Sequence, residues 1–332
     1  MKALVYTAPR QMTLREEPEP VAGTGESVVR VEAVGICGSD MHAYLGHDPR
    51  RVPPLVLGHE VCGRVEGGPF DGRRVILNPL ITCGVCHYCR TGRFNICADR
   101  TMIGMTRPGG YAERLSIPDQ CLVPVPESMD AAHAALTEPA ATAVHALALA
   151  GRAAARPLAE GRALVIGAGS VGLLGALLLS HYGCEAIEIA ERNELRRGTA
   201  AAAAGIGRVF DPVDDSLDQG AFDLVLDCVG GARTREVAMS AIAPGGVFLH
   251  IGLMDNDGGL DARRITLAEI TVIGAYTYTT ADLAAAAAKL GSGALGPLDW
   301  IERRPPADGP RAFAELLEGR IAAPKVVLLP GA

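Results

Sequence analysis

Aromatic side chains are scarce in this chain, where they account for 4% of the 332 residues and include one tryptophan. A large pocket lined by aromatic rings is therefore not expected, and the composition favours a small polar ligand over a bulky aromatic one. Positive charge is not in excess either, because 38 acidic residues outnumber 31 basic ones and give a net charge of −7. This balance argues against a general nucleic-acid or anionic-membrane binder.

Long hydrophobic runs are also missing. The longest uncharged apolar stretch, residues 163–180, contains four glycines and is interpreted as strand, turn and helix rather than as a membrane span. The first ten residues hold an apolar run too short for a secretory signal, so we expect a cytoplasmic protein. In that reducing compartment the nine cysteines are expected to bind metal or take part in chemistry rather than form disulfides.

The pattern of expected strands and helices changes near residue 131. Before this point, short alternating runs such as 28–34 and 63–66 predict a mainly β region interrupted by glycine turns. After it, strands are expected at 163–166, 186–190, 223–227, 247–251, 271–275 and 326–329, and helices at 173–180, 194–204, 234–243 and 281–290. This alternation predicts an α/β fold with a doubly wound parallel sheet and right-handed crossovers beside the mainly β part.

A glycine-rich turn opens the second region. Gly167, Gly169 and Gly172 form a G-x-G-x-x-G pattern between an expected strand and an expected helix. In that context the first glycine makes the tight turn, the second lets the backbone approach a pyrophosphate, and the third lets helix pack on strand. The free N–H groups at the helix start, around Ser170 and Val171, would bind the anion. The sequence thus predicts a bound dinucleotide.

The choice between NAD and NADP depends on the end of the next strand. Glu191 stands there, 19 residues after Gly172, where a carboxylate would bind both ribose hydroxyls and repel a 2′-phosphate. This favours NAD. Arg192, Arg196 and Arg197 follow closely, and an arginine beside the site can pair with a 2′-phosphate, so NADP remains the alternative.

Four cysteines crowd into one short segment. Cys83, Cys86, Cys89 and Cys97 follow the pattern C-x2-C-x2-C-x7-C, which suits one tetrahedral zinc ion with a closed, structural shell of four thiolates. An iron–sulfur cluster or free thiols are the alternatives, but the ferredoxin pattern has a last gap of three followed by Cys-Pro. His87 lies within the segment and is expected to be a surplus, exposed residue.

A second metal site is predicted from three separated motifs. GICGSDMH at 35–42 supplies the thiolate of Cys37, GHE at 58–60 supplies His59 and Glu60, and TEPAA at 137–141 supplies Glu138. Each residue alone is an ordinary core or surface residue. Together, and followed by a dinucleotide turn, they indicate an open metal site with nitrogen, sulfur and oxygen ligands.

With these motifs and GGYAE at 109–113, the chain resembles the zinc-dependent medium-chain alcohol dehydrogenases over essentially its whole length. The resemblance is to the polyol branch, which includes sorbitol, galactitol-phosphate and L-threonine dehydrogenases. It implies that Cys37 and His59 bind a catalytic zinc ion. It also implies that Glu138 is the third ligand, directly or through water, and that Glu60 alternates between ligand and partner.

The resemblance also implies an activity. Hydride would pass between a secondary hydroxyl of a polyol or sugar derivative and the nicotinamide, with zinc lowering the pKa of that hydroxyl. The proton would leave through Ser39 and His42. An L-threonine or amino-alcohol dehydrogenase is the alternative enzyme, and a non-catalytic nucleotide-binding zinc protein is the alternative of another class.

Fold and assembly follow from the same resemblance. We expect a GroES-like catalytic domain at 1–139 and 277–332, a Rossmann domain at 140–276, two zinc ions per chain, and a homodimer or homotetramer. Three arginines stand in segments that resemble substrate loops and are either anion-binding or solvated surface residues: Arg50, Arg51 and Arg107. Four further cysteines are expected in the core: Cys62, Cys121, Cys184 and Cys228.

Overall fold

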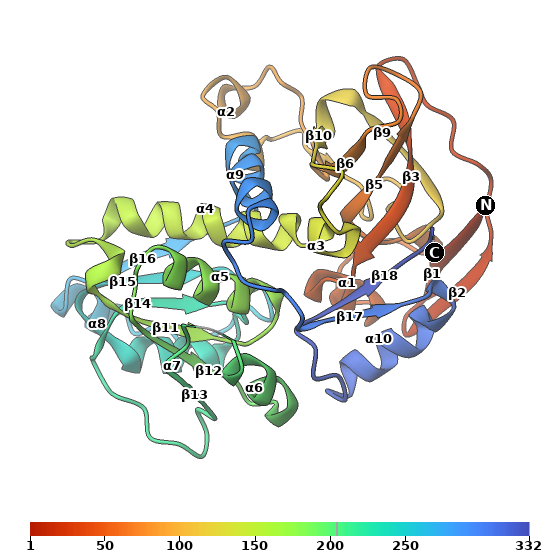
Figure 1. Ribbon diagram of the computed structural model, residues 1–332. Helices are drawn as coiled ribbons and strands as arrows, with labels where there is room; N and C mark the ends of the chain where they lie inside the picture. Colours follow the sequence, from red (N-terminus) through yellow and green to blue (C-terminus); the bar gives the residue numbers. More distant parts are fainter. Residues whose placement is uncertain (204, 332) are drawn as a thin grey trace.

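Two sheets organise the chain in the computed structural model, which describes residues 1–203 and 205–331 (Figure 1). The first is a seven-stranded sheet with the order β10-β6-β5-β3-β18-β17, in which β9 also pairs with β3. Its strands are β3 (Glu26–Gly35), β5 (Glu60–Glu66), β6 (Arg74–Leu77), β9 (Arg114–Pro118), β10 (Leu122–Pro124), β17 (Ile301–Arg304) and β18 (Lys325–Leu328). The C-terminal strands therefore return to the sheet that the N-terminal third of the chain builds.

Smaller elements complete this mainly β part. A three-stranded sheet joins β1 (Lys2–Ala8), β2 (Gln11–Glu16) and β4 (Leu55–Val56), and a two-stranded one joins β7 (Leu80–Ile81) and β8 (Thr101–Met102). Its helices are α1 (Gly38–Tyr44), α2 (His87–Arg90), α3 (Ala131–Ala135) and α10 (Gly309–Leu317). The predicted change near residue 131, from a mainly β region to alternating strands and helices, coincides with the start of α3.

The second sheet has six parallel strands in the order β13-β12-β11-β14-β15-β16. Its strands are β11 (Arg162–Ile166), β12 (Ala186–Ala190), β13 (Arg208–Phe210), β14 (Phe222–Asp227), β15 (Ile242–His250) and β16 (Thr271–Gly274). The helices along this stretch of the chain are α4 (Thr137–Ala153), α5 (Ser170–His181), α6 (Glu194–Ala201), α7 (Ala232–Ala241) and α8 (Ala262–Leu267), and the later helix α9 (Thr280–Gly291) packs along α4. The strand order is that of a Rossmann sheet, so the predicted α/β class is confirmed.

Helices cover both faces of this sheet. Val165 of β11 packs in the core cluster that contains α4, α5 and α9, whereas its neighbours Leu164 and Ile166 pack in the cluster that contains α7. Successive residues of a strand point to opposite faces, and a run buried on both sides reads as continuously apolar. That is why the run at 163–166 predicted a buried strand correctly.

Element boundaries differ from the expectations in a few places. The helix expected at 194–204 ends at Ala201, with a turn at Ala202, and its expected last residue, Ala204, lies outside the described residues. The strand expected at 247–251 begins earlier, at Ile242, because β15 continues through Pro244-Gly245-Gly246 with an irregular register against β14. Proline and glycine there lie within an irregular strand, and the helix expected at 234–243 ends before them, at Ala241.

Among the described residues, no helix combines the length and the hydropathy that a membrane crossing requires.

Candidate active site

Cys37, His59 and Glu60 meet where two strands pair. Gly35, the last residue of β3, lies opposite Glu60, the first residue of β5, in an antiparallel register. Cys37 follows β3 as the N-cap of α1, and His59 precedes β5. One potential ligand atom from each of the three side chains lies within 4.8 Å of the others. The pairing of two strands thus joins motifs that the sequence keeps apart.

Asp40 contacts both Cys37 and His59. It belongs to the motif at 35–42, but the sequence alone indicates no function for it. Its side chain is buried, and Oδ2 accepts hydrogen bonds from the Cys37 N–H at 3.1 Å and the Tyr111 hydroxyl at 2.6 Å. Oδ1 lies 3.5 Å from Nδ1 of His59. Burial raises the pKa of Asp40, but His59, Arg51 and Tyr111 outweigh it and lower the pKa to about 2. An ionised carboxylate behind an imidazole fixes the ring orientation of a metal ligand.

Glu60 has a cationic partner of its own. Nζ of Lys325 lies 2.6 and 2.7 Å from the two Glu60 oxygens and 2.9 Å from the Ile36 carbonyl oxygen. Both side chains are buried, and a Cβ on Gly35 would lie 1.9 Å from Oε2 of Glu60. Gly35 is therefore required for the close approach of the carboxylate.

Glu138 enters from the first turn of α4. It is 8% exposed, and Oε1 accepts a hydrogen bond from the Tyr278 hydroxyl at 2.9 Å. Burial raises the pKa of Glu138 to about 7, and the neighbouring Glu60 adds to this increase while His59 opposes it. Glu138 is not part of the group whose atoms lie within 4.8 Å of one another, so its role as a ligand stays a prediction.

The donor set fits a zinc ion. A thiolate, an imidazole and carboxylates are the ligand types that zinc prefers. The buried carboxylates of Glu60 and Glu138 and the partly buried thiol of Cys37 share one ammonium group, that of Lys325, and a divalent cation would compensate the remaining negative charge. Cys37 and His59 would hold the metal together with a carboxylate from Glu60 or Glu138.

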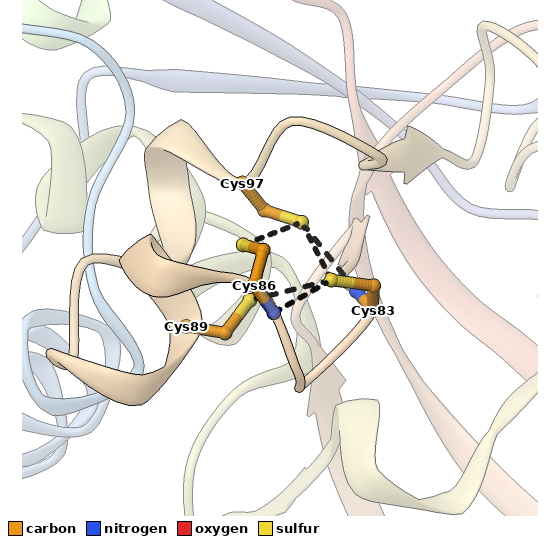
Figure 2. Close-up of side chains that lie close together, drawn as sticks. All are labelled: Cys83, Cys86, Cys89 and Cys97. Carbon is orange, nitrogen blue, oxygen red and sulfur yellow. Dashed lines mark hydrogen bonds between the residues drawn. The ribbon is translucent and has the colours of Figure 1, made fainter.

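The cysteine segment forms a second candidate centre, shown in Figure 2. One potential ligand atom from each of its four cysteines lies within 4.8 Å of the others. Sγ of Cys97 is 3.5 Å from Sγ of Cys83 and 3.8 Å from Sγ of Cys86. A hydrogen bond from the backbone of Cys89 is the main cause that lowers the pKa of Cys86, to about 6. Four thiols around one centre fit a closed tetrahedral shell, and His87 is exposed outside it as expected.

Ser39 and His42, the expected proton carriers, lie on α1 and are partly buried. Burial is the main cause that lowers the pKa of His42. Ser39 accepts a hydrogen bond from Nη2 of Arg51, whose Nη1 lies 2.6 Å from Asp48 and whose Nε lies 3.0 Å from the Gly104 carbonyl oxygen.

All three arginines in the segments that resemble substrate loops prove to be paired with acidic residues. Arg51 is 3% exposed and makes the three contacts just described, so it supports the site from inside the protein instead of receiving a substrate anion. Arg107 pairs with Glu26 at 2.8 Å. Arg50 pairs with Asp48, although its side chain is 55% exposed. A buried guanidinium group such as that of Arg51 needs a partner for its charge, and Asp48 provides one.

The glycine turn adopts the geometry that a dinucleotide requires. Gly167 has a φ of 94°, a backbone conformation that favours glycine. A Cβ on Gly172 would lie 1.9 Å from the Gly167 carbonyl oxygen. Helix α5 begins at Ser170 with no side-chain cap, so Val171 and its neighbours keep N–H groups free for an anion. The turn lies between β11 and α5, beside the point where the strand order reverses.

Glu191 lies at the end of β12, as predicted, and binds the turn itself. It is 9% exposed, and its two oxygens accept the N–H groups of Ala168 and Asn193 at 2.8 Å each. Each carboxylate oxygen keeps a second acceptor position for a ribose hydroxyl.

The three arginines that follow Glu191 in the sequence differ in their surroundings. Arg197 is engaged by Asp211 at 2.8 Å and by backbone carbonyls, so it is not free to bind a phosphate. Arg192 is exposed. Arg196 is partly buried, and its Nε has no hydrogen-bond partner within the described part of the chain.

Comparisons with known proteins agree with this geometry. Residues 23–127 match the alcohol dehydrogenase GroES-like domain, and residues 170–292 match the zinc-binding dehydrogenase family. The chain is 29% identical to L-galactonate-5-dehydrogenase of Escherichia coli over 86% of this chain and 85% of that one. It is 31% identical to L-threonine 3-dehydrogenase of Stenotrophomonas maltophilia over 83% of this chain and 84% of that one.

Solved structures give the same answer for the fold. A zinc-binding dehydrogenase of Sinorhizobium meliloti bound to NADP superposes with a TM-score of 0.86 at 27% identity, covering 99% of each chain. Acetophenone reductase of Geotrichum candidum in complex with NAD superposes with a TM-score of 0.87 at 27% identity, covering 99% of this chain and 96% of that one. A Rossmann sheet, a mainly β part and two zinc-type donor clusters therefore make this chain a member of the zinc-dependent medium-chain alcohol dehydrogenases, an enzyme that acts on a small molecule with a nicotinamide cofactor.

Proposed function

We propose that the enzyme oxidises a secondary hydroxyl of a polyol, sugar or sugar acid with NAD. The observation that carries this proposal is the meeting of Cys37, His59 and Glu60 in a chain that also holds an uncapped, glycine-rich helix start. The similarity to L-galactonate-5-dehydrogenase supports a hydroxylated sugar derivative as the substrate class.

Zinc supplies Lewis acidity when bound, which lowers the pKa of the substrate hydroxyl. Cys37 and His59 hold the ion, and Asp40 keeps the imidazole of His59 in place. The glycine turn binds the cofactor pyrophosphate, so that the nicotinamide reaches the same cleft. Ser39 takes the proton at Oγ, and His42, further along α1, releases it to solvent, helped by the burial that lowers the pKa of its imidazole.

Among the two carboxylates, Glu138 is the better permanent ligand. Glu60 is already neutralised by Lys325, with both of its oxygens engaged. Among the described residues, the hydrogen-bond partner of the Glu138 carboxylate is the neutral hydroxyl of Tyr278. A cation therefore gains more from Glu138 than from Glu60, and Glu60 can replace it when the contact with Lys325 loosens.

NAD is the preferred cofactor because the Glu191 carboxylate stands where a 2′-phosphate would lie. Its negative charge is fixed there by two backbone N–H groups. Arg192 and Arg196 keep some use of NADP possible, since a guanidinium group can pair with the phosphate.

Three further features belong to the same proposal. Two zinc ions bind per chain, one at Cys37 and His59 and one in the cysteine segment. The catalytic domain comprises residues 1–139 and 277–332, with the Rossmann domain at 140–276. The enzyme works as a homodimer or homotetramer.

An L-threonine or amino-alcohol dehydrogenase is the second candidate, favoured by the 31% identity to L-threonine 3-dehydrogenase. Such a substrate carries a carboxylate that needs a cationic partner. Arg51 and Arg107 are paired internally, which leaves Arg50 as the exposed candidate.

A substrate panel tests the proposal. The purified enzyme is assayed with polyols, polyol phosphates, sugar acids and L-threonine, each with NAD and NADP. We expect turnover of a polyol or sugar acid with NAD, and its loss in Cys37→Ser while NADH binding persists. Full activity of Cys37→Ser, or turnover of L-threonine alone, would refute the proposed substrate class or the proposed site.

A further inference from the structure

The cysteine segment is connected to the active site by a chain of partly buried polar contacts. Asn95 lies on the short 3-10 helix of this segment and is 6% exposed. Its Nδ2 donates to the Tyr276 carbonyl oxygen at 2.8 Å and lies 3.5 Å from Nε2 of His145. Asn95 therefore joins the cysteine segment both to α4 and to the stretch between β16 and α9.

His145 continues this chain on its other side. Nδ1 of its ring lies 2.8 Å from Oδ2 of Asp282, in the first turn of α9. The same Oδ2 accepts the Thr279 N–H at 2.9 Å and the Thr279 hydroxyl at 2.7 Å. Helix α9 packs along α4 (Figure 1). One imidazole thus bridges the cysteine segment and the capped start of α9.

These contacts fix the backbone before and after Thr277, a residue with a strained conformation. Thr277 has a φ of 46°, a left-handed conformation that is strained for a β-branched residue. Asn95 holds the carbonyl group of the preceding Tyr276, and Asp282 holds the N–H group of Thr279, two residues after Thr277. A conformation of this kind persists only where its surroundings impose it.

The residue between these anchors reaches the candidate zinc site. Tyr278 is 1% exposed and donates its hydroxyl to Oε1 of Glu138 at 2.9 Å. Tyr278 comes directly after Thr277, so a change of the Thr277 backbone would move this hydroxyl away from the carboxylate. Asn95 and His145 lie outside the metal-binding group. Asn95 reaches the site through this segment, whereas His145 also shares helix α4 with Glu138.

We propose that Asn95 and His145 are positioning residues that fix Tyr278 against Glu138 and so connect the cysteine segment to the chemistry of the site. This inference rests on the proposed function, since it takes Glu138 to be a ligand or a direct neighbour of the catalytic zinc ion. It extends that function by giving the structural centre an effect on the active site, beyond the stability of its own loop.

A double-mutant cycle tests the proposal. Asn95→Ala, Tyr278→Phe and the double variant are compared by kcat and KM on the substrate found in the panel, after zinc content per chain is shown to be equal. We expect Asn95→Ala to lower kcat about tenfold with little change in the KM for NAD, and to have less than a twofold effect in the Tyr278→Phe background. Equal losses in both backgrounds would mean that Asn95 acts on stability alone, which overturns the proposal.

Two histidine variants keep the test independent of folding defects. The side-chain amide of His145→Asn lies near the place of Nδ1, which contacts Asp282. The side-chain amide of His145→Gln lies near the place of Nε2, which contacts Asn95. We expect each to keep more activity than His145→Ala. The half-buried His133 on neighbouring α3 is the matched control, and His133→Asn should behave like the wild type. Equal activities for the Asn, Gln and Ala variants of His145 would contradict a positioning role.

Hydrogen exchange supplies a readout that needs no substrate. Amides of the peptide covering residues 276–282 should lose about tenfold protection in Asn95→Ala and in His145→Ala, but not in His133→Asn. Unchanged protection would overturn the proposal. If the variants lose protection in this way but the wild-type enzyme turns over no polyol or sugar acid, the proposed function fails while the positioning role stands.

Discussion

Nζ of Lys325 lies between the two carboxylate oxygens of Glu60, at 2.6 and 2.7 Å, although 265 positions separate the residues in the chain. The pair is buried, and it joins β18 to β5, the strand that begins at Glu60 directly after His59. The last strand of the chain is thereby coupled to the charge of the metal site. The charge of Glu60 is compensated by Lys325 even before any metal binds.

Removal of Lys325 should therefore destabilise the metal-free chain strongly. In Lys325→Met, Glu60 would remain as an unpaired buried carboxylate, and the free energy of unfolding should fall by about 3–5 kcal/mol. Urea unfolding of metal-free protein measures this loss, with Glu60→Gln/Lys325→Met as the matched control. The double variant should recover most of the stability, and zinc should reduce the loss in the single variant. A single variant as stable as the wild type would contradict the buried pair.

The two carboxylates should differ in how well they retain zinc. We expect Glu138→Gln to lower the affinity for the catalytic zinc ion about 10–100-fold, and Glu60→Gln to lower it less, because Lys325 already neutralises Glu60. Metal analysis after dialysis against a graded chelator measures both. Cys37→Ser and Cys83→Ser serve as controls that each remove one site. A larger effect of Glu60→Gln would reverse the assignment of the permanent ligand.

Glu191→Ala should change both cofactor choice and cofactor affinity. Loss of the carboxylate removes repulsion toward a 2′-phosphate, but it also frees the Ala168 N–H that holds the glycine turn. We expect the KM for NAD to rise about tenfold and the preference for NAD over NADP to fall by more than that.

Two variants separate the effects of charge and of turn geometry. Glu191→Gln keeps an acceptor for Ala168 and should show the change in preference with a smaller increase in KM. Arg192→Ala should lower the remaining use of NADP. If the unmodified enzyme already prefers NADP, the interpretation of Glu191 is wrong.

Local motifs made part of this site predictable. Gly167 and Gly172 sit in one continuous turn whose spacing alone fixes the geometry, and the four cysteines meet within a segment of 15 residues. Asp40 and Tyr111 were visible in their motifs but had no partner in the sequence, since 71 positions separate them.

Contacts between distant segments were not predictable in the same way. Lys325 and Tyr278 reach their carboxylates across 265 and 140 positions, so only the tertiary fold shows these contacts. The contact between His145 and Asp282 could not be predicted either, because 137 positions separate the two residues. Arg51 resembled a surface residue until the fold buried it against Asp48 and Gly104.

The Asp282–His145 contact should make stability depend on pH in the acid range. Burial raises the pKa of Asp282, but hydrogen bonds from His145 and Thr279 outweigh it and lower the pKa to about 2. Because the folded-state pKa lies below the ordinary value near 4, this carboxylate stabilises the fold above pH 4. Its contribution should be lost as the pH falls from about 4 toward 2.

Asp282→Asn removes this titration and provides the comparison. The variant should be less stable than the wild type at pH 6, and the difference should shrink steadily between pH 4 and pH 2, as urea unfolding at a series of pH values would measure. Asp308→Asn at an exposed helix start is the matched control, and its difference from the wild type should stay small throughout. A gap between Asp282→Asn and the wild type that stays constant down to pH 2 would mean that the ionised Asp282 contributes nothing through its charge. The start of α9 would then depend on neutral hydrogen bonds alone.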